Sequence, residues 1–460
     1  MLDMEIDTGD TAWVLVSAAL VLLMTPGLAL FYGGMVRSKS VLNMMLMSFA
    51  SLGVIGVLWV LFGYSMTFGS SVGNARIVGN PLEYLGLEGL MSPDAVAGTV
   101  PALAFVSFQA VFAIIAVALI SGAIADRAKF GTWIVFTVVW ATLVYFPVAH
   151  WVFAFDATDD AGAVTTYGGW IANSVQALDF AGGTAIHINA GAAALALALV
   201  VGKRIGFAKE PMRPHNLPLV MLGAGLLWFG WFGFNAGSAL GANTLASVAF
   251  VNTIVATSAA ILGWLLLERL RDGHPTSLGA ASGVVAGLVA ITPAANSVSP
   301  VGALVIGLVA GVACAAAVGL KYRFGYDDSL DVVGVHLVGG LVGTLLIGFL
   351  AHPQSPAEVA GLFYGGGFDQ LGRQAIGAFA VLVYSFVVTL LIALLLKAVM
   401  GWRVPAEAES DGIDGDQHAE SGYDLHPLRG GSGMIATATA AGSTRATSAE
   451  AAPTKSEELA

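Results

Sequence analysis

Long apolar stretches alternate with short polar ones along most of the chain. Eleven of these stretches carry almost no charge, and each reaches the roughly 17 residues that a helix needs to cross a hydrocarbon core. We predict membrane-spanning helices over residues 11–34, 41–69, 100–125, 130–150, 180–201, 217–240, 244–267, 277–296, 300–320, 331–351 and 374–400. The pattern therefore predicts an all-α polytopic membrane protein.

The composition agrees with this pattern. Of 460 residues, 57% are apolar, 11% are charged and 58 are glycine, whereas about a quarter of the residues in a soluble protein are charged. Glycine lets helices approach closely in lipid. The single cysteine excludes an intramolecular disulfide and a cysteine metal cluster, and no motif of an enzyme, a metal site or a cofactor site is present. We expect a membrane protein that is not an enzyme.

Basic residues predict the orientation. Fourteen lysines and arginines fall in every second loop, and only Arg76 and Arg373 fall in the other loops. Because basic loops stay in the cytoplasm, we expect the N-terminus outside and the C-terminus inside. No Lys or Arg precedes Arg37, so the basic start of a signal peptide is missing, and we expect the first span to be retained.

The composition changes at about residue 404, where Ala, Ser, Thr, Gly and acidic residues take over. We predict a membrane domain over 1–403 and a cytoplasmic tail over 404–460, disordered beyond about 425. The tail carries most of the net charge of −11, so that charge says little about the substrate. No basic patch supports binding to nucleic acid.

Two histidines lie inside predicted spans, where an ionisable side chain is a functional hypothesis by default. His187 lies about 12 Å along its helix from Asp179, and His336 lies about 7.5 Å from Asp331. These depths are measured from opposite faces of the membrane, which leaves the histidines about 10 Å apart in depth. The pair can meet near the midplane, where two neutral imidazoles can pass a proton.

The alternative for each histidine is a hydrogen-bonded packing residue. This packing alternative is weaker if the first five spans and the next five form an inverted repeat, since the two histidines then occupy equivalent positions. For Asp331 we favour helix capping. For Asp179 we favour a double role, in which it starts its helix and holds negative potential near an outer vestibule.

Aromatic residues gather near the predicted outer ends of the spans. As a set with the Ser238 hydroxyl they can bind a small cation, at about 0.5–2 kcal/mol per ring, although an aromatic belt at the membrane interface explains any one of them. The aromatic residues are Phe108, Phe112, Trp151, Phe153 and Phe234. This chemistry suits a cation that donates hydrogen bonds.

Six motifs carry a resemblance to a known family. In order along the chain they are LFYGGMVRSKSVLN, DFAGGTAIHINAG, RPHNLP, GWFGFNAGSA, AFVNT and DVVGVH. With them, residues 8–424 resemble the bacterial Amt branch of the ammonium transporter (Amt/Mep/Rh) family. The resemblance implies eleven helices in the lipid bilayer of the inner (cytoplasmic) membrane, a homotrimer, and one pathway for ammonium or ammonia through each protomer.

Site residues follow from the resemblance position by position. The resemblance implies a twin-histidine pair at His187 and His336, a structural acid near the recruitment site at Asp179, an outer-site hydroxyl at Ser238, and stacked gate rings at Phe112 and Phe234. Where the family usually has an outer Trp, this chain has Phe153, with Trp151 two positions earlier. The tail up to about residue 425 resembles a regulatory tail that takes part in control by a PII-type signalling protein.

Selectivity indicates a mechanism. Potassium and ammonium ions have equal charge and similar size, but only ammonium can release a proton. We predict that ammonium is recruited at the outer aromatic site and deprotonated, and that ammonia then passes the histidine pair while the proton moves separately, which makes transport electrogenic. Two alternatives stay open: an electroneutral ammonia channel of Rh type, and an ammonium sensor that signals through the tail.

Overall fold

The computed structural model describes residues 5–159 and 161–423. Within them, ten helical spans are long and apolar enough to cross a membrane: Thr8–Met35, Val41–Phe68, Ala102–Ile124, Phe130–Phe153, Gly183–Val201, Leu217–Ala239, Thr244–Arg271, Pro300–Phe324, Val333–Leu350 and Asp369–Val399. A shorter apolar helix, Ser277–Ile291, lies at the place of the eighth predicted span. The prediction of an all-α polytopic membrane protein is confirmed, and the expected disorder beyond about residue 425 lies outside the described residues.

The first five spans are built from helices with local breaks. They contain α1 (Thr8–Met35), α2 (Val41–Leu58), η1 (Trp59–Gly63), α3 (Tyr64–Phe68), α4 (Ala102–Ile120), η4 (Ser121–Ile124), α5 (Phe130–Trp140), η5 (Ala141–Tyr145), α6 (Phe146–Phe153), η7 (Gly183–Ile188) and α7 (Asn189–Val201). Of these, η1, η5 and η7 are π-helical turns and η4 is a 3₁₀ turn.

The remaining spans follow the same order. They contain α8 (Leu217–Asn235), η8 (Ala236–Ala239), α9 (Thr244–Arg271), α10 (Ser277–Ile291), α11 (Pro300–Ala317), α12 (Leu320–Phe324), η9 (Val333–Leu337), α13 (Val338–Leu350) and α14 (Asp369–Val399). The eighth span ends earlier than predicted because Pro293 follows α10 and cannot donate a helical hydrogen bond. Asn252 then holds the turn by donating to the Ala295 and Val298 carbonyls, both at 2.9 Å.

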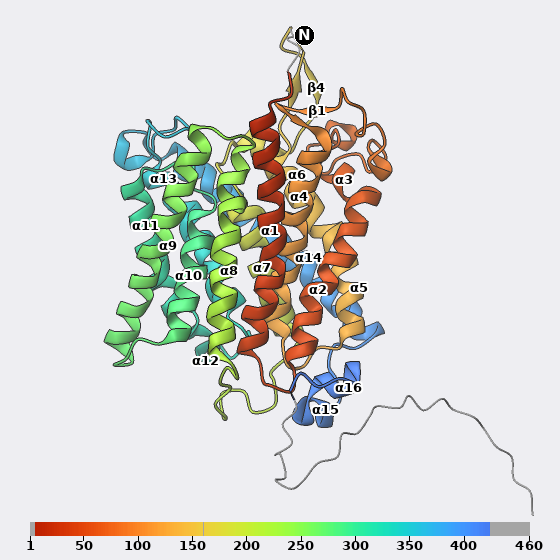
Figure 1. Ribbon diagram of the computed structural model, residues 1–460, viewed down its shortest axis with the longest axis vertical. Helices are drawn as coiled ribbons and strands as arrows, with labels where there is room; N and C mark the ends of the chain where they lie inside the picture. Colours follow the sequence, from red (N-terminus) through yellow and green to blue (C-terminus); the bar gives the residue numbers. More distant parts are fainter. Residues whose placement is uncertain (1–4, 160, 424–460) are drawn as a thin grey trace, which may run out of the picture. The chain divides into compact units, whose positions relative to one another are not determined.

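Helices pack side by side through glycine. In Figure 1, α1 lies along α8, while α9 packs against both α10 and α11. A Cβ at Gly223 of α8 would lie 2.4 Å from the Phe31 nitrogen of α1, and one at Gly307 of α11 would lie 2.0 Å from the Ala256 oxygen of α9. Such contacts replace hydrophobic burial as the force that holds helices together in lipid.

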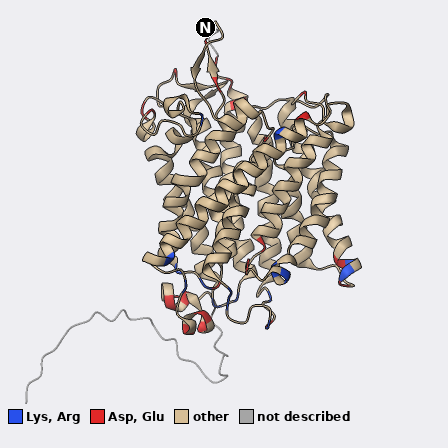
Figure 2. Ribbon diagram, turned by 180° about the vertical axis from the view of Figure 1, so that it is seen from behind, with Lys and Arg blue, Asp and Glu red and all other residues tan. Residues whose placement is uncertain are grey.

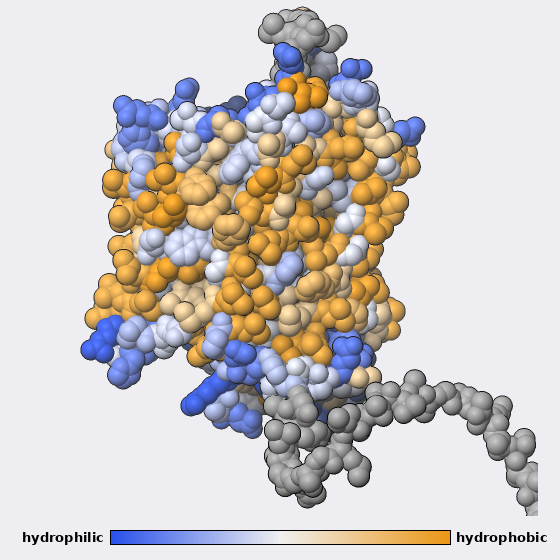
Figure 3. Space-filling view, viewed as in Figure 1, coloured by the Kyte–Doolittle hydropathy of each residue, from blue (hydrophilic) through white to orange (hydrophobic). Residues whose placement is uncertain are grey.

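Charge and hydropathy divide the molecule into layers. Charged residues gather at the two ends of the bundle (Figure 2), and a broad apolar band lies between them (Figure 3). One end carries the short elements β1 (Val96–Ala97), β2 (Val100–Pro101), β3 (Ala157–Thr158), β4 (Val164–Thr166), η2 (Val72–Asn74), η3 (Leu85–Leu87), η6 (Ile171–Val175) and η10 (Leu362–Tyr364). We call this end the outer end, following the predicted orientation.

The opposite end carries the start of the tail, with α15 (Ala406–Asp411) and α16 (Ile413–His418). Asp414 accepts hydrogen bonds from the backbone nitrogens of Leu42 at 3.0 Å and Asn43 at 2.8 Å. His418 contacts the Asn43 amide oxygen at 2.9 Å. Asp414 therefore caps the N-terminus of α2, where the local residue Ser40 makes no side-chain cap bond.

Candidate functional site

Two histidines face each other in the interior of the bundle. His187 in η7 is fully buried, and His336 in η9 is 3% exposed. Their Nδ1 atoms lie 3.3 Å apart, and the rings stack with an interplanar angle of 26°. One Nδ1 must carry a proton and the other must accept it, because two lone pairs or two N–H groups would repel. The two side chains therefore meet in the interior of the bundle.

Both histidines lie in a π-helical turn at the beginning of a span, a feature frequent at functional sites. Asp179 precedes the first turn and accepts from the backbone nitrogens of Gly182, Gly183, Thr184 and Ala185, and from the Thr184 hydroxyl. Asp328 precedes the second and accepts from the nitrogens of Val332 at 3.1 Å and Val333 at 2.7 Å. A carboxylate fixes the start of each histidine-bearing span.

The second cap differs from the sequence-based prediction, which assigned it to Asp331. Asp331 has a left-handed backbone, with φ at 64°, and its carboxylate accepts from the Lys321 ammonium at 2.7 Å. Asp328, three residues earlier, is buried and takes the cap instead. Burial and the neighbouring Asp331 raise the pKa of Asp328 above its usual range.

A narrow apolar lumen lies beside the histidines. Its cavity volume is about 10 Å³, which is close to the least that holds one water molecule. The Trp231 ring stacks on His187 at 5.4 Å between centroids, and its Nε1 donates to the Thr292 hydroxyl at 2.9 Å. The lining residues are Met24, Leu28, Phe31, Ile115, Leu119, His187, Leu227, Trp231, Phe234, Val285 and His336. Apart from the imidazoles and the indole, the walls offer only apolar side chains.

A pair of stacked phenylalanines separates this lumen from a wider cavity. Phe112 and Phe234 lie with ring centroids 4.3 Å apart and an interplanar angle of 30°. Phe234 lines the lumen, and Phe112 lines the wider cavity. Phe108 supports Phe112 edge-on at 4.7 Å. The structure places the two predicted gate rings together at the boundary between the two spaces.

The wider cavity, which we call the vestibule, has a volume of about 790 Å³ at the outer end of the bundle. It contains Phe112, Phe153 and Ser238, three of the predicted cation-binding residues. Ser238 donates to the Phe234 carbonyl at 2.8 Å, which leaves its oxygen lone pairs available to a donor. The full lining is Asp10, Tyr64, Phe68, Ala97, Gly98, Thr99, Phe105, Gln109, Phe112, Phe153, Phe155, Ala157, Phe180, Ala181, Ser238, Ala239, Leu240 and Asn243.

Trp151 is not among the described residues that line the vestibule. Its Nε1 donates to the Ile77 carbonyl at 2.7 Å, and its ring contacts Tyr384 at 4.7 Å between centroids. Two positions on a helix differ by about 200°, so Trp151 and Phe153 cannot face the same side of α6. The structure brings Phe153, but not Trp151, to the predicted outer site.

Asp179 also lies outside the vestibule lining, although its neighbours Phe180 and Ala181 form part of the wall. Both of its carboxylate oxygens accept backbone hydrogen bonds, at 2.6 to 3.2 Å. This geometry matches the structural part of the double role. The recruitment of a cation by its negative potential stays a prediction.

The rim of the vestibule is held by a hairpin of β3 and β4. Arg76 donates to both oxygens of Asp156, at 2.8 and 2.7 Å, and the Gly168 nitrogen donates to the same carboxylate at 2.8 Å. The hydrogen bond from Arg76 lowers the pKa of Asp156. Phe155, next to this clamp, is 71% exposed at the vestibule edge. An ion pair therefore fixes the position of the rim.

Sequence reasoning missed several residues of these two spaces. Gln109 lines the vestibule one turn before Phe112, and Asp10 lines it from the start of α1. The spacing of three residues from Phe112 could have indicated Gln109. Trp231 was missed because only packing brings it onto His187. No signal in the sequence alone marks that contact.

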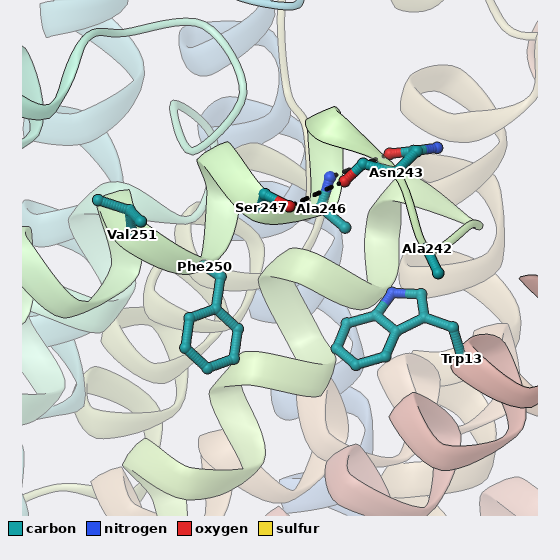
Figure 4. A pocket seen from close by; sticks show the side chains of 7 residues that line it. All are labelled: Trp13, Ala242, Asn243, Ala246, Ser247, Phe250 and Val251. Atoms are coloured by element: carbon teal, nitrogen blue, oxygen red, sulfur yellow. Dashed lines mark hydrogen bonds between the residues drawn. The ribbon is translucent and has the colours of Figure 1, made fainter. Parts of the chain in front are cut away.

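A second, apolar pocket lies between α1 and the outer half of α9 (Figure 4). It has a volume of about 450 Å³ and is lined by Trp13, Ala242, Asn243, Ala246, Ser247, Phe250 and Val251. Phe250 and Val251 are 37% and 45% exposed. The polar groups nearby serve the helix start, where Asn243 accepts from the Ala246 nitrogen at 3.1 Å. This pocket shares no lining residue with the lumen beside the histidines.

Comparison with known proteins gives one consistent result. Residues 12–423 match the Ammonium Transporter Family. An ammonium transporter of Mycobacterium tuberculosis is 64% identical over 440 residues, with 91% of each chain covered. One of Bacillus subtilis is 45% identical over 419 residues, which cover 90% of this chain and 98% of that one.

Solved structures share the fold. A sensor Amt protein superposes with a TM-score of 0.80 at 30% identity, covering 89% of this chain and 98% of the other. Mep2 of Saccharomyces cerevisiae superposes with a TM-score of 0.79 at 33% identity, covering 88% and 89%. The arrangement of spans around the two histidines is thus that of a known class of membrane proteins.

Proposed function

The chain belongs to the ammonium transporter family, and we propose that it carries ammonium across the cell membrane by separating the ion into ammonia and a proton. The 3.3 Å contact between the Nδ1 atoms of His187 and His336 carries this proposal. A histidine pair in an apolar lumen can accept and pass on a proton, while neutral ammonia crosses without the cost of a desolvated charge.

Recruitment takes place in the vestibule. The faces of Phe112 and Phe153 attract a cation by about 0.5–2 kcal/mol per ring, and the Ser238 oxygen accepts a hydrogen bond from it. All three line the same cavity. An ammonium ion can use both the rings and the hydroxyl, whereas a potassium ion has no hydrogen bond to donate.

Selection takes place between the vestibule and the lumen. The stacked rings of Phe112 and Phe234 close the direct path, and the lumen beyond them, at about 10 Å³, has no room for a hydrated ion. Ammonium can leave its proton and enter as ammonia, but potassium has no neutral form. The proton moves along the imidazoles of His187 and His336, so that net charge crosses the membrane.

An inverted repeat of five and five spans followed by a final helix fits this mechanism. The fifth and tenth spans each begin with a π-helical turn that contains a histidine, and each is preceded by a capping aspartate. Equivalent elements that meet near the midplane are typical of such repeats. We propose that the N-terminus lies outside and that the tail, from residue 404, lies in the cytoplasm.

An electrical measurement tests the proposal. The protein is reconstituted in liposomes on a solid-supported membrane and receives ammonium at fixed pH, with potassium and a His187→Ala variant as controls. We expect a saturable current for ammonium, none for potassium, and a changed current or selectivity in the variant. Internal alkalinisation without current would instead support the electroneutral channel, which the weaker π donor Phe153 favours, and would remove the proton relay.

A sensor is the second candidate function. The fold superposes on a sensor Amt protein with a TM-score of 0.80, and the tail docks on α2 through Asp414. In a sensor, occupancy of the vestibule would alter the tail and flux would be incidental. Loss of a partner's response with flux intact, after alteration of the tail, would favour this function. A PII-type signalling protein is the partner that we propose.

We propose a homotrimer as the working assembly. The apolar pocket between α1 and α9 (Figure 4) and the exposed apolar residues Leu262 of α9 and Val301 of α11, at 67% and 70% exposure, offer faces that another copy can cover. Native mass spectrometry in detergent should then give a complex of three 47.1 kDa chains. A chain that stays monomeric under conditions that retain transport would contradict the assembly.

A further inference from the structure

A basic cavity lies at the tail end of the bundle, away from the transport pathway. Its volume is about 330 Å³, and three separate segments form it: the loop between α1 and α2, the loop before α8, and the tail at α15. The lining residues are Arg37, Ser38, Lys39, Arg213, His215, Ser410 and Gly412. In the ribbon of Figure 2, Lys and Arg positions, coloured blue, also occur at this end of the molecule.

The cavity carries three basic side chains, Arg37, Lys39 and Arg213, and no acidic residue is among its described lining residues. The side chains of Lys39 and Arg213 make no hydrogen bond or ion pair with the described residues. Arg37 lies 3.7 Å from the Asp126 carboxylate, which Arg204 also binds at 3.3 Å. Positive charge in the cavity is therefore only partly compensated.

The buried acids of the tail do not supply the missing charge. Asp414 is occupied by the Leu42 and Asn43 nitrogens, and Glu409 accepts from the Ile205 nitrogen and the Arg403 guanidinium. Both carboxylates hold the tail against the membrane domain. Among the described residues, neither of these two carboxylates is therefore available as a counter-charge for Lys39 or Arg213.

Backbone packing fixes the tail at the cavity wall. Gly412 has a φ of 129°, and a Cβ there would lie 2.6 Å from the Lys39 Cβ. The Asp414 nitrogen donates to the Lys39 carbonyl at 3.1 Å. Lys39 and the tail are therefore in direct contact, and the cavity is complete only while the tail is docked.

We infer that this cavity binds a phosphate group, either free or as a phosphomonoester. A tetrahedral dianion can present oxygens to cations from three directions at once, whereas a single carboxylate presents two oxygens in one plane. Guanidinium groups match phosphate oxygens in geometry and charge. The hydroxyls of Ser38 and Ser410 add donors, and the volume of about 330 Å³ leaves room for a small organic group on the phosphate.

Binding has a consequence for the tail. The anion joins the loop of Arg37 and Lys39, the loop of Arg213 and the tail at Ser410. A ligand that binds only the docked arrangement stabilises that arrangement by mass action. The site thus couples the docking of the tail to the supply of a phosphorylated compound, and this coupling does not depend on how ammonium crosses the lumen.

Binding to the full-length protein in nanodiscs of zwitterionic lipid tests the inference. Sodium phosphate and sodium glycerol phosphate are titrated at constant ionic strength, binding is followed by calorimetry, and hydrogen exchange is followed over residues 406–418. We expect saturable binding together with slower exchange in the tail. Arg213→Gln should raise the dissociation constant about ten-fold, the effect of losing one charge-assisted contact, and Ser410→Asp should abolish binding by placing a carboxylate in the cavity.

Lys209→Gln is the matched control, because Lys209 is an exposed cation of the same loop that does not line the cavity. Equal affinities in Arg213→Gln, Lys209→Gln and the unaltered protein would overturn the inference, as would the absence of saturation. Nanodiscs that contain phosphatidate separate the two sources of the phosphate group. Protection of the tail that needs this lipid and Arg213 identifies a lipid headgroup, whereas protection by the soluble anions identifies a free ligand. All of these readouts are independent of ammonium current.

Discussion

The vestibule and the histidine lumen are neighbours built on opposite principles. The vestibule, at about 790 Å³, is wide and lined by aromatic rings, hydroxyls and amides, whereas the lumen, at about 10 Å³, is almost closed and apolar around two imidazoles. In the mechanism that we propose, the first attracts a hydrated cation and the second admits only what has lost its charge. Affinity and selectivity are then set in separate places.

The two spaces also differ in how they are held. Carboxylates fix the lumen by capping the histidine-bearing spans: Asp179 is partly buried and Asp328 is buried. Part of the vestibule rim is fixed by the pair of Arg76 and Asp156, whose side chains are 22% and 19% exposed. Changes at the lumen should therefore have large effects and changes at the rim small ones.

The largest effect is expected for His336→Leu. Leucine keeps the lumen apolar but removes the partner of His187, so the proton has no path. We expect the ammonium current to fall by at least about a hundred-fold, within the range that loss of a positioned proton acceptor causes. His352→Leu, on a half-buried histidine of an outer loop that does not line the lumen or the vestibule, is the control and should keep its current. A wild-type current in His336→Leu would contradict the proton relay.

Asp179→Ala should have the next largest effect, on stability. The change leaves the backbone nitrogens of Gly182, Gly183, Thr184 and Ala185 without their acceptor. We expect a loss of about 3 kcal/mol, since each buried unsatisfied donor costs about 1–3 kcal/mol and water can reach some of them. Thermal unfolding in detergent measures it.

Asp159→Ala provides the comparison for Asp179→Ala. Asp159 accepts from the Ala161 and Ala163 nitrogens at the exposed hairpin, and its loss should cost about 1 kcal/mol or less because water replaces the partner. Equal losses in the two variants would show that the lumen is not held more firmly than the rim.

Phe153→Trp should change affinity without changing selectivity. Tryptophan is the stronger π donor, and a gain of about 0.5–1 kcal/mol lowers the ammonium concentration at half-maximal current by a factor of two to five. The response to potassium should stay absent. Phe363→Trp, on an exposed residue of another outer loop, is the matched control. A potassium current in Phe153→Trp would place selection in the vestibule.

The same assay separates the two rings that the sequence offered for the outer site. Trp151→Phe should leave the concentration dependence unchanged, because the Trp151 indole points to the Ile77 carbonyl. If Trp151→Phe shifts the ammonium concentration at half-maximal current as much as Phe153→Trp does, Trp151 contributes to the outer site.

Sequence reasoning succeeded where the signal is one-dimensional. The spans follow from hydropathy, and the histidines stand out because ionisable residues are rare in them. Reasoning from depth placed His187 and His336 near the midplane, and packing then brought their nitrogens to 3.3 Å. These features depend only on how far along the helix axis a residue lies, and that distance follows directly from the residue number.

It failed where the answer depends on rotation or on distant packing. Trp151 was placed at the outer site because it is near Phe153 in sequence, although the helix turns it away. The prediction assigned the second cap to Asp331 because that residue directly precedes the span. In the structure Asp331 pairs with Lys321, and Asp328 makes the capping hydrogen bonds instead. Asp414 in the tail caps α2, and this contact joins residues more than 370 positions apart in the sequence. No local sequence pattern marks such a contact.

The smallest effect is expected for Arg76→Gln, through pH. In the folded protein the hydrogen bond from Arg76 lowers the pKa of Asp156 below its usual value of 3.8. The pair therefore contributes its stability above pH 3.8, and the contribution is lost as the pH falls through the lowered pKa of the folded state. For a partly exposed pair it amounts to about 1 kcal/mol or less.

Hydrogen exchange across β3 and β4 measures this loss. The hairpin of the unaltered protein should stay protected down to about pH 4 and open below it, whereas that of Arg76→Gln should exchange faster already at neutral pH. At neutral pH, exchange around His187 should be the same in the two proteins, because Asp179 holds that turn and Arg76 does not reach it. An Arg76→Gln variant that also loosened the histidine-bearing span would show that the rim and the lumen act as one unit, and the separation of affinity from selectivity would fail.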